Sequence, residues 1–341
     1  MNKIINNFFT KHNINASKKI IISIDLDNAL VIRGKGSNYV NPEIKKIISS
    51  LIDGGQILLI PNTGREIIGF TSFKKQFLNC QNGILCSGSL VIYNDKMFFN
   101  EKSEIDPRIQ EIFLSAVKND LLPFVDFSYI DGRFIVYNEH GLQYKDLFLS
   151  QNPADWFEGH LPPRENINSL SEKNLNGVCR LEFPVMKAYK NHLALFMRLM
   201  DKYEDNIKQL EQLLNINGSE ILKDYSVKKK FFFNDHYDKN EITFARLGKL
   251  TSFTNKGMGL RIWLEKAESH YHNHVMIHIG DQDTGLINDT LIKEEVPEAL
   301  IVMVGEKCSL HNPTVDLYLR GDTEEYLLLF FRELLQRLKN V

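Results

Sequence analysis

The stretch that decides the fold is residues 20–30, which read IIISIDLDNAL. Its first five positions are nearly all β-branched, which is typical of a strand buried on both faces of a sheet. The run ends abruptly in two aspartates, Asp25 and Asp27. Because open parallel sheets bind ligands at the carboxyl ends of their strands, this stretch predicts a central strand and one edge of a functional site.

A helix and a second strand follow, in the order that a parallel sheet requires. We predict the helix over residues 42–53, with Asn41 as its N-cap, Pro42 at its first position and Gly54 just past its end. The next apolar run, residues 56–60, predicts a second buried strand, which ends in the sequence PNTGR. This strand–helix–strand order predicts a parallel sheet with right-handed crossovers.

The same alternation returns near the C-terminal end, whereas the middle of the chain has a different character. The elements predicted near the end are a helix at 258–269, strands at 275–279 and 299–304, and an apolar helix at 323–339. The elements predicted in the middle are short strands at 134–137, 178–183, 229–233 and 241–244, and a long helix at 189–214. We therefore predict an α/β core in two parts, residues 1–104 and 250–341, with an α+β domain inserted at 105–249.

Composition narrows the class of protein. The 341 residues are 43% apolar and 25% charged, as in soluble globular proteins of about two domains. A net charge of −2 gives no reason to expect a nucleic-acid or membrane partner, and no apolar run is long enough to cross a bilayer. The first residues show no signal peptide, and four cysteines without metal-ligand spacing favour a reducing compartment, so we expect the cytoplasm. Nothing in the sequence indicates an oligomeric state.

Polar residues follow three of the predicted strands, and together they suggest phosphate chemistry. Asp25 and Asp27 follow the first strand, Thr63 follows the second, and Asp281 follows the strand at 275–279. One carboxylate can act as a nucleophile, and another can protonate a leaving oxygen and then activate water. Several carboxylates and a phosphate would repel one another, so a cation is needed, and Mg²⁺ suits oxygen ligands.

Four motifs in the expected order resemble those of the haloacid dehalogenase (HAD) superfamily. The segment 25–30, DLDNAL, resembles the family's DxDGTL, and NTGR at 62–65 is similar to the ATGR of its Cof-type and sugar-phosphatase branches. NKGMGL at 255–260 resembles KGxAL, and GDQDT at 280–284 resembles the fourth motif, as in trehalose-phosphate phosphatases. Residues 86–93, CSGSLVIY, look like the family's NGALIY stretch. The matches cover residues 1–100 and 250–341.

The resemblance implies a fold, a reaction and a role for each matching residue. The fold would be a Rossmannoid core with a C2-type cap, and the reaction a Mg²⁺-dependent hydrolysis of a phosphate monoester, most simply a sugar phosphate. Asp25 would be the nucleophile and Asp27 the acid/base, with Asp25, Asp27 (through its carbonyl) and Asp281 on the metal. Thr63 and Lys256 would bind and stabilise the transferring phosphoryl group, with Gly64 and Arg65 beside them at the substrate.

The chain departs from the family pattern at two places. Asn28 and Ala29 replace a Gly-Thr pair, although Asn tolerates unusual backbone angles. Gly285 stands where the family has a second acid that supports the metal, and Asp283 or Asp289 could substitute through water. Two alternatives therefore stay open: a catalytically weakened protein that binds a phospho-ligand in a regulatory role, and a phosphotransferase with the same covalent intermediate.

The histidines at 270, 272 and 274, with His278 beyond them, invite a zinc interpretation. We instead expect a polar loop that leads into the strand, with His278 packed inside it. For Arg65, an ion pair at the edge of the core is an alternative to a contact with the substrate.

Overall fold

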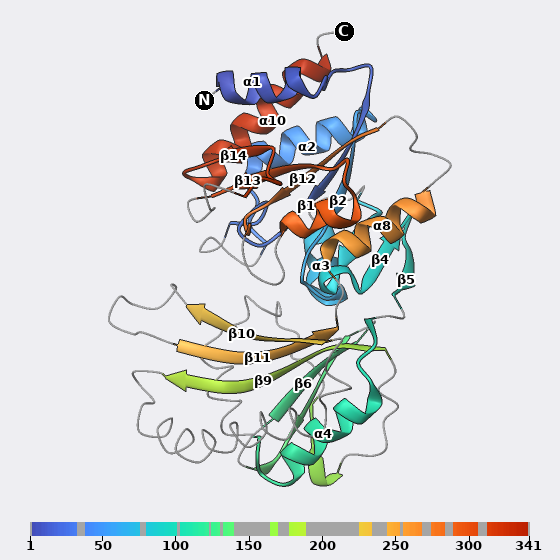
Figure 1. Cartoon of the computed structure of the whole chain (residues 1–341), viewed down its shortest axis with the longest axis vertical. Coiled ribbons are helices and arrows are strands. Elements are labelled where there is room, and N and C mark those ends of the chain that lie inside the picture. The colour runs from blue at the N-terminus through green and yellow to red at the C-terminus, as the bar shows by residue number, and fades with distance from the viewer. Residues whose placement is uncertain are drawn as a thin grey trace. The chain divides into compact units, whose positions relative to one another are not determined.

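The computed structural model describes fourteen stretches of the chain: residues 2–32, 38–75, 80–100, 103–122, 124–129, 132–139, 164–169, 177–188, 225–233, 244–252, 255–267, 274–283, 289–305 and 312–339. The chain divides into two compact units (Figure 1). The first comprises residues 1–65, 69–100 and 254–341, and the second comprises residues 66–68 and 101–253. Among the described residues, no helix combines the length and the apolar character needed to cross a membrane.

The first unit is built on a five-stranded parallel sheet. Its strand order is β14 (Leu317–Leu319), β13 (Leu300–Val304), β12 (His274–Gly280), β1 (Lys19–Ile24) and β2 (Ile57–Pro61). β1 lies between β12 and β2, so the segment 20–30 is central in the sheet, as its unbroken apolar run predicts. The carboxyl ends of β2, β1 and β12 therefore meet at one edge.

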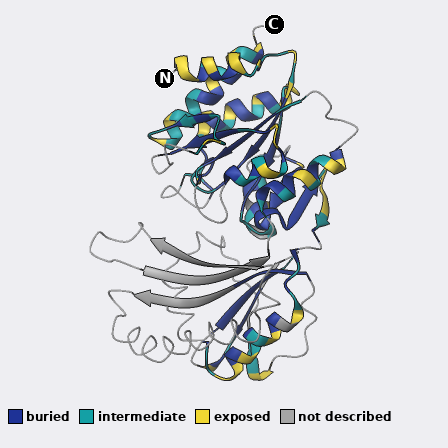
Figure 2. Ribbon diagram, in the orientation of Figure 1, coloured by how far each residue is buried: buried dark blue, intermediate teal, exposed yellow. Residues whose placement is uncertain are grey.

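Helices cover both faces of this sheet (Figure 1). The helices α2 (Pro42–Asp53) and α10 (Thr323–Lys339) cover one face, and α1 (Asn2–Lys11) packs on α10. The helix α8 (Lys256–Ala267) covers the other face, where Ile292 of α9 (Ile292–Glu295) belongs to the same core as Trp263 of α8. α2 forms because the Asn41 carboxamide accepts from the amides of Glu43 and Ile44, and its apolar residues recur on one buried face. The side of α10 that faces the sheet is buried along its length (Figure 2).

An apolar core lies between the sheet and the helices α8 and α9. It includes Ile21 of β1, Ile60 of β2 and Met276 of β12, packed against the fully buried Trp263 of α8. Because side chains alternate across a strand, residues two positions further along each strand lie on this same face. A small antiparallel sheet, β3 (Gly83–Leu85), β4 (Leu90–Tyr93) and β5 (Lys96–Phe99), extends the unit through a parallel bridge from Asn62 to Ile84. The short helix α3 (Ile67–Lys74) follows β2.

The second unit has a six-stranded sheet. Its strand order is β10 (Tyr225–Phe233), β11 (Phe244–Ser252), β9 (Val178–Ala188), β6 (Phe124–Tyr129), β7 (Gly132–Tyr137) and β8 (Arg164–Asn166). All neighbours are antiparallel except β7 and β8. The helix α4 (Pro107–Lys118) packs on this sheet through a core that includes Ile109, Phe113 and Phe127. The expected α/β architecture with an additional α+β unit is confirmed.

Two predicted elements begin or end at other residues in the structure, and a third cannot be compared. The helix expected at 258–269 begins two residues earlier, at Lys256, because the Asn255 carboxamide accepts from the amide of Met258. The strand expected at 241–244 ends where β11 begins: β11 runs from Phe244 to Ser252. The prediction stopped too early because the Gly and Lys residues in this stretch are unusual in strands. The long helix expected at 189–214 lies outside the described residues.

Candidate active site

The sheet register brings two aspartates from distant parts of the sequence together. β1 and β12 are parallel, with Ile24 opposite Ile279, and the Asp25 amide donates to the Ile279 carbonyl at 2.8 Å. Asp25 and Asp281 thus follow neighbouring strands at the same edge. The chain turns away at once after Asp25, since the Leu30 amide donates back to the Asp25 carbonyl at 3.2 Å. The turn leaves the carboxylate of Asp25 at the strand end.

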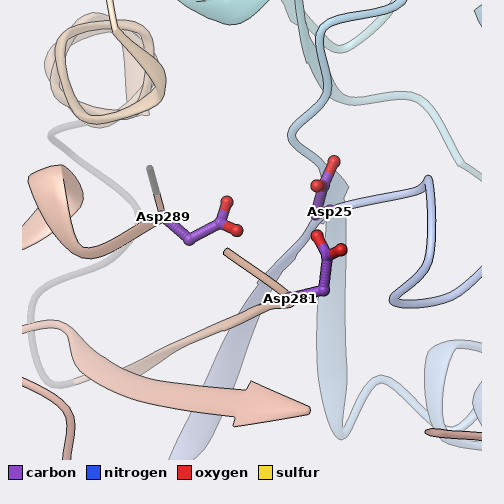
Figure 3. Close-up of side chains that lie close together, drawn as sticks. All are labelled: Asp25, Asp281 and Asp289. Carbon is purple, nitrogen blue, oxygen red and sulfur yellow. The ribbon is translucent and has the colours of Figure 1, made fainter. Parts of the chain in front are cut away.

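A third carboxylate completes an acidic cluster. Asp289, in the short 3₁₀ helix at residues 289–291, offers an oxygen that lies within 4.8 Å of oxygens of Asp25 and Asp281. Figure 3 shows the three side chains converging from separate segments. Asp289 is almost fully buried and its Oδ2 accepts from the backbone amide of Gln282 at 3.1 Å. Asp289 is therefore a fixed part of the site.

Lys256 supplies the positive charge beside these carboxylates. Its Nζ lies 2.9 Å from Asp25 Oδ2 and 2.6 Å from Asp289 Oδ1, and the whole residue is buried. Lys256 is the first residue of α8, whose close approach to the turn at 86–88 depends on small residues. A Cβ at Gly88 would lie 2.0 Å from the Asn255 carbonyl oxygen, and one at Gly259 would lie 2.5 Å from the Ile84 side chain. These glycines let α8 bring the lysine up to the strand ends.

Burial and charge shift the pKa values of these groups in opposite directions. Burial raises the pKa of Asp25 to about 8, against the opposing effect of Lys256, and the charges of Asp289 and Asp281 raise it further. Burial also acts to raise the pKa of Asp289, but the closer Lys256 ammonium and the His278 hydrogen bond outweigh it, so that pKa is held below its usual range. Burial acts to lower the pKa of Lys256, yet the two carboxylates raise it and keep the amine charged. The cluster therefore carries more negative than positive charge once Asp25 ionises.

Asp27 is engaged with Arg65. Arg65 Nε donates to Asp27 Oδ2 at 3.1 Å and Arg65 Nη2 donates to Asp27 Oδ1 at 2.9 Å, while Arg65 Nη1 donates to Asn38 Oδ1 at 2.5 Å. Both carboxylate oxygens thus accept from one guanidinium, the bidentate arrangement that arginine favours. The structure therefore contains the ion pair that the sequence left as an alternative for Arg65, and a contact between Arg65 and substrate stays a prediction.

Thr63 and Gly64 lie at the same strand ends. The Asn62 amide donates to the Ile24 carbonyl at 2.7 Å, so Thr63 follows β2 beside the point where Asp25 follows β1. The Thr63 amide donates to the Ile84 carbonyl at 2.8 Å, and its Oγ1 accepts from the Arg65 amide at 3.2 Å. Gly64 faces the Ser87 hydroxyl at 3.4 Å from where a Cβ would stand. The structure therefore gathers Asp25, Asp27, Thr63, Lys256 and Asp281 at one sheet edge.

Comparison with known proteins gives matches in structure and not in sequence. No family model matches the sequence, and no curated protein matches it either. A HAD/COF-like hydrolase from Plasmodium vivax aligns over 96% of this chain and 98% of its own, with a TM-score of 0.58 at 14% identity. A HAD subclass IIB sugar phosphatase aligns over 90% and 95%, with a TM-score of 0.55 at 11% identity. A haloacid dehalogenase-like hydrolase from B. subtilis aligns over 92% and 98%, with a TM-score of 0.53 at 13% identity.

This chain has the haloacid dehalogenase fold. The resemblance drawn from four short motifs is confirmed at the level of the fold, because the HAD/COF-like and sugar phosphatase structures align over at least 90% of the chain. At these identities, the roles of individual residues rest on the geometry of the site.

The two departures from the HAD motifs fall differently in the structure. Asn28 has a φ of 65°, so it adopts the left-handed conformation expected of it. Its side chain also donates from Nδ2 to Asp281 Oδ2 at 3.1 Å, a contact that glycine could not make. Gly285 lies outside the described residues. Asp289, four positions further along, is the buried acid that stands beside Asp25 and Asp281.

The donor set fits a hard divalent cation. Three carboxylates offer oxygens within 4.8 Å of one another, and among the described residues no histidine or cysteine belongs to this group. Mg²⁺ prefers oxygen ligands, and a bound cation would offset the charges of Asp289 and Asp281, which add to the effect of burial in raising the pKa of Asp25. Asp25, Asp281 and the Asp27 carbonyl stay the predicted metal ligands, with the Asp289 carboxylate in the same cluster.

Sequence reasoning missed two features of the site. Asp289 was considered only as a remote substitute acting through water, whereas it contacts Lys256 directly. Its position could not be read from motif spacing, since the loop that separates it from Asp281 has no fixed length. His278 is packed in its strand as expected, but its ring also contacts Asp289, with Nε2 3.1 Å from Asp289 Oδ1. A polar residue inside an apolar strand was the available signal.

Proposed function

We propose that this protein hydrolyses a phosphate monoester of a small molecule through a phosphorylated Asp25. The single observation that carries the proposal is the contact of a buried lysine with a buried aspartate at the end of a central strand, Lys256 Nζ to Asp25 Oδ2 at 2.9 Å. A carboxylate held there can attack phosphorus, and the adjacent ammonium can offset the charge on the phosphoryl oxygens. Asp281 and Asp289 add the negative charge that a divalent cation would balance.

The reaction runs in two displacements. An oxygen of Asp25 forms a bond to phosphorus while the bond from phosphorus to the leaving oxygen breaks, and Asp27 gives that oxygen a proton. Asp27 then takes a proton from water, whose oxygen attacks the same phosphorus, and the bond from phosphorus to Asp25 breaks to release inorganic phosphate. Thr63 and Lys256 hold the phosphoryl oxygens in both steps.

Two conditions must be met before Asp25 can react. Asp25 must lose its proton, which its raised pKa of about 8 opposes at neutral pH. When bound, Mg²⁺ supplies positive charge that favours the ionised carboxylate and screens the phosphate oxygens. Asp27 must also exchange at least one of its two hydrogen bonds with Arg65 for a contact with the substrate. We infer that phosphate groups draw Arg65 away, since guanidinium binds phosphate in the same bidentate manner.

The class of substrate and the cellular location are also part of the proposal. Similarity to a structure described as a HAD subclass IIB sugar phosphatase favours a sugar phosphate over other monoesters. The net charge of −2 favours a small phosphorylated molecule over nucleic acid or a membrane surface as the partner. We propose a cytoplasmic location because the spacing of the cysteines fits neither a metal site nor a disulfide framework, and Cys80, Cys86 and Cys179 are buried.

Phosphate release from a panel of sugar phosphates and an aryl phosphate tests the proposal. We expect release with Mg²⁺, little release with a chelator, and loss of activity in Asp25→Asn. Asp95→Asn is the matched control, because it makes the same chemical change at a half-exposed carboxylate that pairs with Lys74. Phosphate release that survives Asp25→Asn would overturn the mechanism. If Asp95→Asn also abolished release, the loss in Asp25→Asn would not be evidence for a specific role of Asp25.

A binding protein without turnover is the second candidate. The bidentate pair between Arg65 and Asp27 favours it, because Asp27 with both oxygens engaged is not poised to donate a proton. The same panel decides: calorimetric binding of a phosphate ester with Mg²⁺, with no release above that of Asp25→Asn, would support this candidate and exclude the phosphatase.

A further inference from the structure

Three polar side chains form a row across the sheet, directly below the acidic cluster. They are Ser23 of β1, Asn62 just past β2, and His278 of β12, and all three are fully buried. Each stands two positions beyond an apolar residue of the core under α8, so the row lies on the sheet face that α8 covers. The register places Ser23 directly opposite His278. The three core residues are Ile21, Ile60 and Met276.

With a neutral His278 ring, the hydrogen bonds of this row have a defined direction. Asn62 Nδ2 donates to Ser23 Oγ at 3.2 Å, and Ser23 Oγ lies 3.0 Å from His278 Nδ1. His278 Nε2 lies 3.1 Å from Asp289 Oδ1. A carboxylate only accepts, so Nε2 carries a proton and donates; in the neutral ring Nδ1 then accepts, and the Ser23 hydroxyl donates to it. Each of the three hydrogen bonds from Asn62 to Asp289 then has one donor and one acceptor.

The environment of His278 agrees with a neutral ring. Burial lowers its pKa, in opposition to the Asp289 carboxylate, and the Lys256 charge lowers it further. Asp289 and Lys256 are the charged groups that face the ring, from the 3₁₀ turn at 289–291 and from the start of α8. The neutral ring can act as a fixed donor without adding charge to the cluster.

The row ends on the carboxylate that holds the lysine. Asp289 Oδ1 accepts from both His278 Nε2 and Lys256 Nζ, and Asp289 Oδ2 accepts from the Gln282 amide. The other end of the row reaches the same lysine, because Asn62 Nδ2 also donates to the Lys256 carbonyl at 3.2 Å. Lys256 is thus fixed at its backbone by one end of the row and at its ammonium by the other.

We propose that His278 is a positioning residue, which orients Asp289 and through it holds Lys256 against Asp25. The inference rests on the proposed function of Asp25 and Lys256. Isoleucine or valine at this position would suit a buried strand better, because a buried polar group that is left unsatisfied destabilises the folded state. A histidine in this strand is therefore explained by what it holds. Without the imidazole donor, Asp289 would keep one contact fewer and Lys256 would lose its fixed position.

Two substitutions at residue 278 distinguish the effect of the hydrogen-bond donor from the effect of the side-chain volume. His278→Leu keeps much of the volume and removes the donor, whereas His278→Gln keeps a donor at the place of Nε2. We expect kcat to fall about 10- to 100-fold in His278→Leu, the usual effect of losing a residue that supports a ligand, with KM within about twofold. His278→Gln should recover most of kcat. Met276→Leu, one row lower on the same face of β12, is the control and should leave kcat unchanged.

A spectroscopic measurement tests the same inference without turnover. In the ¹⁵N-labelled full chain, we expect His278 to give the pattern of a neutral ring protonated on Nε2. We also expect a protected Lys256 ammonium signal that disappears in His278→Leu and persists in His278→Gln.

The outcomes are distinct. A folded His278→Leu with unchanged kcat and an unchanged Lys256 signal would overturn the inference, as would a proton on Nδ1 in the unsubstituted protein. If the unsubstituted protein released no phosphate above Asp25→Asn, the proposed function would fail, and the two NMR signals would still decide the position of Lys256. If His278→Leu does not fold, His278→Gln and the ring tautomer decide.

Discussion

Each of the two units contains a buried basic side chain that pairs with at least one carboxylate. The two units differ in how many carboxylates surround that side chain. In the second unit, Arg180 donates from Nη2 to Glu66 at 3.0 Å and from Nε to Ser128 at 3.1 Å, so its one charge has an anionic partner. In the first unit, Lys256 faces Asp25 and Asp289, with Asp281 beside them. A balanced pair is what a structural contact needs. A cluster with surplus negative charge costs stability unless a cation offsets it, and this difference supports the proposed metal site.

Replacing the basic side chain of each unit in turn should give the largest difference in kcat between the two units. Lys256→Met should lower kcat by about 10²–10³-fold, the usual effect of losing one charge-stabilising donor. Arg180→Met should leave kcat within a fewfold. Both variants should lose about 3–5 kcal/mol of unfolding free energy without metal, because each strands a buried carboxylate. Steady-state kinetics and urea unfolding measure the two effects, and equal losses of kcat would erase the distinction between the units.

The pH dependence of stability should also separate the units. The pKa of Asp25 is raised to about 8 in the folded protein, so between about pH 4 and pH 8 the folded state binds a proton that the unfolded state has released. Asp25 therefore destabilises the metal-free protein progressively as pH rises through this window. Asp25→Asn should gain stability relative to the unsubstituted protein by up to about 1.4 kcal/mol per pH unit there. Chelator-treated unfolding series measure it, with Asp95→Asn as the control; a constant difference from pH 4 to pH 8 would contradict the shift.

Metal addition should stabilise one unit only. Mg²⁺ at about 100 times its dissociation constant should add about 2.7 kcal/mol to the unfolding free energy. The gain should be lost in Asp281→Asn and kept in Glu66→Gln, which weakens the Arg180 pair without touching the acidic cluster. Thermal unfolding with and without a chelator checks this. A gain that Glu66→Gln removes and Asp281→Asn retains would place the cation elsewhere.

Arg65→Lys should have the smallest effect. Lysine keeps the charge beside Asp27 but cannot make both hydrogen bonds at once, so kcat should change by less than about tenfold. The direction is informative. A higher kcat would mean that the guanidinium keeps Asp27 from transferring its proton, and a lower kcat would mean that it aligns Asp27 for the transfer. The pH profile of kcat distinguishes a change in Asp27 from a loss of folding.

The sequence predicted the core far better than the details of the site. The bounds of α2 and α10 follow from caps and from apolar residues at helical spacing, which are local properties. Asp25, Thr63 and Asp281 were placed correctly at strand ends, because a parallel sheet aligns those ends regardless of what lies between them. Asp289 and His278 were not foreseen as partners of Lys256, because their contacts depend on loop length and on register across three strands. Likewise, no local pattern distinguished an Arg65 bound to Asp27 from one that awaits a substrate.

The polar row of Ser23, Asn62 and His278 also has a consequence for how the chain assembles on the ribosome. Ser23 and His278 are 255 positions apart, and Lys256, which accepts from Asn62, is 194 positions away from it. Until those residues emerge, β1 and β2 would expose polar groups on a face meant to be covered, and the parallel sheet would lack its other three strands. In the second unit, by contrast, the strands that the structure describes all lie between residues 124 and 252. Synthesis therefore favours an order in which the second unit folds first and the earliest strands wait for the latest ones.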